Sequence, residues 1–206
     1  RLQQVMKPQP VRFTGVSGEL VFDQNGIDIR NLSGRLETNG FKVAGHIDGY
    51  TPDATAHLRL SSLDSENIYI PHAPRYISSL PGAVREIYDH LRPVGSARIA
   101  FELIRTEPGG RPKVSGQVEI VDGQFTFDRF PYPLRNVTGK IILGTDPEHG
   151  WERLELSGLR GYGIAGGPNA DKLVQVSGTI GPLGPESAVH IEVRGKNIVN
   201  EPALLA

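Results

Sequence analysis

The sequence predicts a mainly β protein in which a long curved antiparallel sheet forms an open groove, or half-pipe, with one short helix. Short runs of alternating apolar and polar residues recur along the 206 residues, as in strands with one apolar face. The 25 Gly and 16 Pro are typical of strands joined by turns, and they disfavour a helix bundle. A β-sandwich is the alternative fold, because the same alternation would also fill a closed core.

Eleven runs with this alternation predict the strands. In chain order they are residues 19–22, 27–30, 41–43, 56–60, 99–103, 118–120, 124–127, 141–143, 154–156, 174–176 and 189–193. Three dipeptides that tolerate the positive φ angles of tight hairpins lie between runs: Asn25-Gly26, Asn39-Gly40 and Asp122-Gly123. Neighbouring strands are therefore expected to pair antiparallel.

One segment has a helical period instead. Its apolar residues recur at the i, i+3, i+4 and i+7 positions of one helical face: Val84, Ile87, Tyr88 and Leu91. Pro81 suits a first helical position, and Pro93 ends the run. The pattern predicts a single helix near 82–91, whose apolar face packs against the sheet or closes one end of the groove.

The two halves of the chain resemble each other. The matching pairs are residues 30–36 with 135–141, and residues 43–60 with 176–193. Because the two matches have different offsets, the second copy carries an insertion near 144–172. The predicted divisions of this one continuous β-groove segment are a first β repeat, a helical connector and a second β repeat: residues 1–72, 73–95 and 96–206.

The composition argues against several kinds of chemistry. The absence of Cys removes disulfides, thiolate metal sites and cysteine nucleophiles. A net charge of -1, without a run of Lys and Arg, argues against a nucleic-acid partner. None of the six His lies beside Ser or Asp in a nucleophile-elbow context. We therefore expect no catalytic residues, no metal site and no cofactor.

Two motifs have a simpler structural interpretation. Residues 161–166 fit GxGxxG, but the following Gly167, Pro168 and Asn169 prevent the helix that a nucleotide site needs, so a loop is expected. A second group has metal-ligand residue types at a spacing that fits neither zinc nor calcium: Asp146, Glu148, His149 and Glu152. We expect a solvated loop there.

Several segments carry a resemblance to a known family. They are residues 18–23, 26–36 and 42–47 in the first copy, and 118–125, 134–141 and 189–198 in the second. They share a sequence pattern in which a strand is followed by Asn, an apolar residue, Ser or Thr, and Gly. This pattern resembles that of AsmA-like proteins, which include TamB-type proteins. The resemblance implies a groove in the periplasm, a parent chain anchored in the inner membrane, and a role in intermembrane phospholipid transport or outer-membrane biogenesis. The implied partners are phospholipid acyl chains, neighbouring segments of the same chain and envelope membrane proteins.

The lining of such a groove is predicted from strand parity. Residues of one parity are expected to share the concave apolar face: Ile27, Ile29, Phe41, Val43, Leu58, Leu60, Phe125, Phe127, Val174, Val176, Ile191 and Val193. Their polar neighbours, such as Asp28 and Arg59, would face water. In the alternative, this face is a closed core, and the protein is a non-catalytic structural or adhesive β-sandwich that binds a protein or a glycan.

Overall fold

Alternating side chains and frequent turns produce a protein made almost entirely of strands. The structure, a computed structural model, describes residues 13–64, 66–70, 85, 88–89, 92–127, 130–183 and 187–199. The strands are β1 (Phe13–Phe22), β2 (Gly26–Leu36), β3 (Asn39–Asp48), β4 (Thr55–Ser62), β5 (Ile68–Ile70), β6 (Val94–Arg105), β7 (Lys113–Phe127), β8 (Phe130–Thr145), β9 (Glu152–Tyr162), β10 (Leu173–Gly181) and β11 (Ala188–Gly195).

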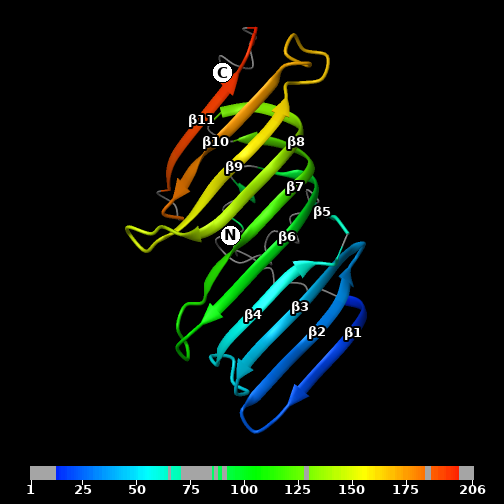
Figure 1. Ribbon diagram of the computed structural model, residues 1–206, viewed down its shortest axis with the longest axis vertical. Helices are drawn as coiled ribbons and strands as arrows, with labels where there is room; N and C mark the ends of the chain where they lie inside the picture. Colours follow the sequence, from blue (N-terminus) through cyan, green and yellow to red (C-terminus); the bar gives the residue numbers. More distant parts are fainter. Residues whose placement is uncertain are drawn as a thin grey trace, which may run out of the picture.

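All eleven strands belong to one open antiparallel sheet that does not close into a barrel (Figure 1). Their order is β1-β2-β3-β4-β6-β7-β8-β9-β10-β11, so nearly every strand pairs with its neighbours in the chain. The short β5 pairs with β6 beyond the end of β4. The predicted open mainly β fold is confirmed, and no second sheet of a sandwich is found in the ranges that the structure describes.

The predicted strand segments all lie within observed strands, but one predicted turn is wrong. Residues 118–120 and 124–127 belong to the single strand β7, so Asp122-Gly123 is not a hairpin turn. The pairing of β7 with β8 shifts register between Ile120 and Gly123, which is the signature of a β-bulge. Gly is favoured in both settings because it accepts unusual backbone angles, so the dipeptide alone did not distinguish them.

The first two hairpin turns lie close to their predicted positions. At the turn between β1 and β2, the Asp23 carboxylate accepts hydrogen bonds from the backbone N–H groups of Asn25 (2.7 Å) and Gly26 (3.0 Å). Between β2 and β3 the turn residues are Glu37, with φ of 56°, and Thr38, while Asn39 already begins β3. Local side-chain hydrogen bonds of this kind favour turns over continued strands.

Helical structure is almost absent from the described chain. Within the predicted helix near 82–91, the structure describes Arg85, Tyr88 and Asp89, all in helical conformation, and the other residues lie outside the described ranges. The Tyr88 side chain is buried. No described helix has the length and apolarity needed to cross a bilayer. β5, with three residues, was too short for the alternation to predict.

The internal repeat has a counterpart in the backbone. Asn31 and Asn136, at matched positions, both have φ of 51°, and the matched Gly45 and Gly178 have φ of 145° and 151°. A Cβ at Gly45 would overlap the carbonyl oxygen of His57, and one at Gly178 would overlap that of His190, again a matched pair. The insertion in the second copy contains β9, which separates β8 from β10, whereas the corresponding β2 and β3 are direct neighbours. The boundaries at 73 and 95 stay a prediction.

Strand β8 is strongly bent, and Figure 1 shows it arching behind β9 and β10. Register shifts in its pairing with β9, between Arg135 and Thr138, coincide with the positive φ of Asn136. Bulges of this kind bend a strand and increase its twist. A hydrogen bond fixes the bent segment to the C-terminal end of β9: Arg135 Nε donates to the carbonyl oxygen of Gly163 at 2.9 Å.

The bend encloses the core of the molecule. Its buried side chains all come from β7–β10: Ile120, Phe125, Val137, Ile141, Leu143, Leu154, Leu156, Leu159 and Ile180. Leu154 and Ile180 are 0% exposed. One sheet therefore buries part of its own apolar face by curling, and the other part of that face belongs to the candidate site.

Candidate functional site: a continuous apolar face

The most extensive candidate surface is the apolar face of the sheet, which the strand register makes continuous. One row of aligned positions crosses nine strands from β2 to β11: Leu32, Val43, Leu60, Phe101, Gly116, Leu143, Leu154, Ile180 and Val189. At about 4.8 Å between strands, this row extends roughly 38 Å along the curved sheet. Every position in it is apolar or glycine, so the face has no polar break along this path.

The residues predicted to line a groove lie on this face. The row beside the first contains Ile29 and Leu58, and the matched strands β10 and β11 place Val176 opposite Val193. Phe41, Ile27, Leu60, Val174 and Ile191 follow the same parity, and Phe125 belongs to the buried core on that side. The side chain of Phe127 lies outside the described part. That any of these residues contacts lipid stays a prediction.

The exposure of this face differs sharply between its two ends. In β7–β10 the curl buries it, as the core residues show. In β2–β4 the corresponding side chains, including Val43 and Leu60, are only partly buried. On β1 the apolar residues are open to solvent, with Leu20 44% and Phe22 60% exposed. Within the described strands no second layer covers β1–β4, and the apolar side chains there are exposed on β1 and partly exposed on β2–β4.

Sequence reasoning missed several members of the face. Leu20, Phe22, Leu32 and Leu103 belong to it by register, but they were not among the predicted lining residues. Leu32 follows the positive-φ residue Asn31, where the β2–β3 register shifts. The sequence signal that could have indicated Leu32 is the repeat, which matches it to another apolar residue, Val137, at the same place after Asn.

The opposite face of the same strands carries the charges. Across β1 and β2, Arg30 forms a salt bridge with Glu19 at 3.3 Å. Across β4 and β6, Glu102 accepts from His57 at 2.6 Å and from Arg59 at 3.2 Å. The His57 hydrogen bond, followed by that of Arg59, lowers the pKa of Glu102. This hydrated face fixes which side of the sheet is left for apolar contacts.

His46, on this charged face, lies between two carboxylates that raise its pKa. Its Nδ1 lies 2.6 Å from Asp28 Oδ1 and its Nε2 lies 3.0 Å from Asp48 Oδ1. The hydrogen bond with the Asp28 carboxylate is the largest cause that raises the pKa of His46 above 6.5, and the Asp48 carboxylate adds to it. The protonated ring therefore links β2 to β3 through Asp28.

We expect the free energy of unfolding to decrease as the pH rises through the raised pKa of His46. Because the folded pKa lies above the unfolded value of 6.5, the contribution is complete below 6.5 and is lost at higher pH. Urea midpoints measured between about pH 6 and pH 8 should fall in the native chain, and His46→Gln should remove that part of the slope. An identical slope in the variant would contradict the assignment.

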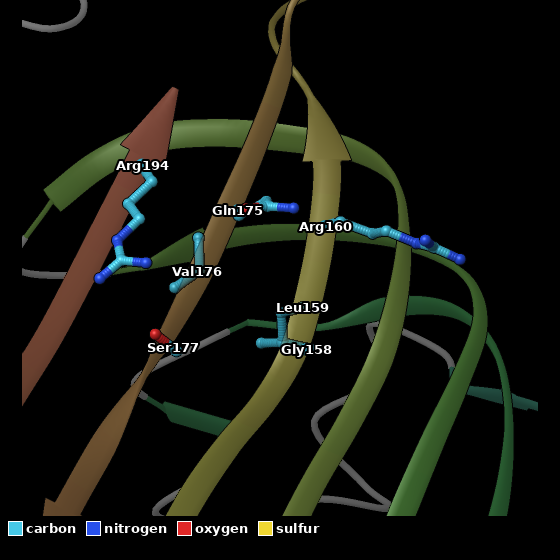
Figure 2. A pocket seen from close by; sticks show the side chains of 7 residues that line it. All are labelled: Gly158, Leu159, Arg160, Gln175, Val176, Ser177 and Arg194. Atoms are coloured by element: carbon cyan, nitrogen blue, oxygen red, sulfur yellow. The ribbon is translucent and has the colours of Figure 1, made fainter. Parts of the chain in front are cut away.

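Figure 2 shows the surface depression formed by β9, β10 and β11, which is open and has a volume of about 290 Å³. Arg160 and Arg194 contribute to its lining, but in Figure 2 the Arg160 side chain points away from Arg194. Arg160 donates to Thr138 at 3.1 Å and Arg194 pairs with Glu192 at 2.7 Å. The two cations therefore do not converge on a common ligand.

The two motifs noted in the sequence lie only partly in loops, because Glu152 begins β9 and Gly161 and Tyr162 end it. Asp146 closes the turn between β8 and β9, since its carboxylate accepts from the backbone of Glu148 and His149 and from Arg153. The side-chain hydrogen bond from His149 is the largest cause that lowers the Asp146 pKa to about 2. No group of metal-ligand residues is found in the part of the chain that is described. Residues 163–172, which follow β9, contain turns and no helix.

Comparisons with family models, with curated proteins and with solved structures find no match for this chain.

Proposed function

We propose that this chain is a groove-forming segment of a bacterial envelope protein that shelters the acyl chains of phospholipids during intermembrane transport or outer-membrane biogenesis. The observation that carries the proposal is the continuous apolar face, which is exposed on β1, only partly buried on β2–β4, and backed by a charged, hydrated face. The resemblance to AsmA-like proteins indicates that the ligand of that surface is a phospholipid acyl chain. The proposed location is the periplasm, in a parent chain anchored in the inner membrane, with neighbouring segments and envelope membrane proteins as further partners.

The energetics agree with such a role. Exposing a hydrocarbon chain of roughly 16 methylenes to water costs on the order of 13 kcal/mol, at about 0.8 kcal/mol per methylene. The exposed apolar side chains on β1 and the partly exposed ones on β2–β4 are costly for the same reason, and contiguous apolar surface of this kind marks interaction sites. An acyl chain laid across these strands removes both surfaces from water. No bond is made or broken in this process, and the proposal assigns no catalytic residue.

The direct test is to identify what the purified chain carries. The chain is purified without detergent, and native mass spectrometry and organic extraction are applied to the same sample. Bound phospholipid supports the proposal. A homogeneous lipid-free chain that also takes up no phospholipid from vesicles would contradict it.

Substitution of Val43 tests the same idea at one position. Val43→Asp places a carboxylate on the open apolar face, and we expect at least a tenfold loss of acyl-chain affinity, since burying an unpaired charge against hydrocarbon is costly. The fold should persist, because Val43 is only partly buried. Photo-crosslinking to a diazirine-labelled phospholipid measures the loss.

The matched control for this experiment is Ala44→Asp. Ala44 is the next residue of β3 and faces the other side, with Arg59 as its partner on β4. The same charge is thereby introduced at almost the same place, but on the charged face and next to Arg59, which already pairs with Glu102. Equal losses of crosslinking in the two variants would exclude the apolar face as the binding surface.

A further inference from the structure

The open apolar face carries one charged residue, and that residue is a cation. Among the described positions that share this face in β1–β6, the side chains are apolar or small and uncharged polar groups, apart from Arg105 at the end of β6. Arg105 aligns with Ala56 on β4 and follows the parity of Leu103 and Phe101. It therefore lies at the rim of the face, where the strands give way to the hairpin turns.

The hydrogen bonds of Arg105 are incomplete. Its Nη1 donates to the carbonyl oxygens of Pro52 (2.9 Å) and Ala54 (3.2 Å) in the turn between β3 and β4. Its Nε is buried and has no hydrogen-bond partner, and no described carboxylate forms a salt bridge with it. Asp53 is close enough to interact electrostatically with Arg105. A cation with a buried unsatisfied donor is normally supplied with an acceptor.

We propose that Arg105 binds the anionic head of an amphiphile whose hydrocarbon tail lies along the apolar face of β4 and β6. This inference rests on the proposed function and adds an orientation to it, with the head at the rim and the tail directed past Leu103 and Phe101. From Arg105 to Ile99 the strand provides about 20 Å of apolar surface at 3.4 Å per residue. Charge complementarity favours an anion, because guanidinium groups pair well with phosphate and carboxylate oxygens.

The test compares two probes with the same tail. Dodecyl phosphate carries an anionic head and dodecanol does not, and both are titrated into the full chain against a fluorescent apolar reporter. We expect Arg105→Gln to lower the affinity for dodecyl phosphate about tenfold, since a charge-assisted contact at a partly exposed rim is lost. The affinity for dodecanol should change by less than about twofold. Inorganic phosphate alone should not displace either probe, because it lacks the tail.

Two further variants separate the head-group contact from a structural role of Arg105. Arg105→Lys keeps the charge and should retain most of the preference for dodecyl phosphate. Asp53→Asn removes the neighbouring negative charge and should strengthen dodecyl phosphate binding, the opposite direction from Arg105→Gln. The matched control is Arg59→Gln on the charged face of β4, which should change neither affinity.

The outcomes distinguish this inference from the proposed function. If both probes bind the native chain but Arg105→Gln weakens them equally or not at all, Arg105 only holds the β3–β4 turn and the orientation is wrong. If neither probe binds the native chain, both the orientation and the lipid-binding function fail. If Arg105→Gln does not fold, two other variants decide the question: Arg105→Lys should retain most of the preference for dodecyl phosphate, and Asp53→Asn should strengthen dodecyl phosphate binding.

Discussion

Leu154→Ala is expected to lower the free energy of unfolding by about 3 to 4 kcal/mol, in the middle of the range for buried Leu→Ala changes. Leu154 is 0% exposed and lies between Leu143 of β8 and Ile180 of β10, both nearly or fully buried. Neighbours held on both sides by strand pairing are poorly placed to collapse into the cavity. Urea denaturation monitored by far-UV circular dichroism measures the loss.

The companion variant for this experiment is Leu58→Ala on the open half of the same face. Leu58 is partly exposed, so it buries less apolar surface on folding than Leu154 does. We therefore expect its replacement by Ala to lower the free energy of unfolding by about 1 kcal/mol. The difference between the two variants reports how unequally the face is packed. Equal losses would mean that the β1–β4 end is as tightly covered as the core, and the proposed acyl-chain surface would then be untenable.

Gly178→Ala is expected to cost about 3 kcal/mol or more, because two effects combine. Gly178 has φ of 151°, a conformation that costs an L residue energy, and the added Cβ would overlap the carbonyl oxygen of His190 on β11. The clash is with backbone, so no side-chain rotation relieves it. Thermal or urea unfolding of the variant measures the effect.

Gly144→Ala is the matched control for this prediction. Gly144 also lies in a strand, its φ is not in the positive range, and a Cβ there would have no atom within 4 Å. We expect a change within about 0.5 kcal/mol, or a slight stabilisation through the unfolded state. Gly45→Ala, at the position that matches Gly178 in the first copy, should behave like Gly178→Ala. If Gly45→Ala causes little loss of stability, the two copies of the repeat differ in how strongly they depend on this glycine.

Most of the strands and the apolar parity were predictable because both follow from a period of two. Val43 and Leu60 alternate with Lys42 and Arg59, and a one-residue register slip would have placed charges on the apolar face. The sequence was less informative where the period breaks. At Asp122-Gly123 a bulge within β7 has the same local composition as a hairpin turn.

The unequal exposure of the candidate surface was not predictable from the pattern. Val43 and Val176 occupy matched positions and read alike in the sequence, yet Val176 packs against the buried core while Val43 belongs to the open half. The local backbone does not separate the two halves either, since the matched residues Asn31 and Asn136 both have φ of 51° and both lie at a register shift. The position of Arg105 on the apolar face was also not predictable, because polar residues are common at the ends of strands.

The nearest-neighbour strand order has a consequence for how this protein acquires its structure. Apart from β5, each strand pairs with the strands that flank it in the chain, so the sheet requires few distant encounters. Such local connectivity favours rapid folding, in contrast with Greek-key β proteins. It also makes the molecule a nearly linear array, in which hairpins add one after another and loss of a terminal strand removes a single interface. Cooperative unfolding should then depend on the curled β7–β10 end, and the flatter β1–β4 end should be the first to open.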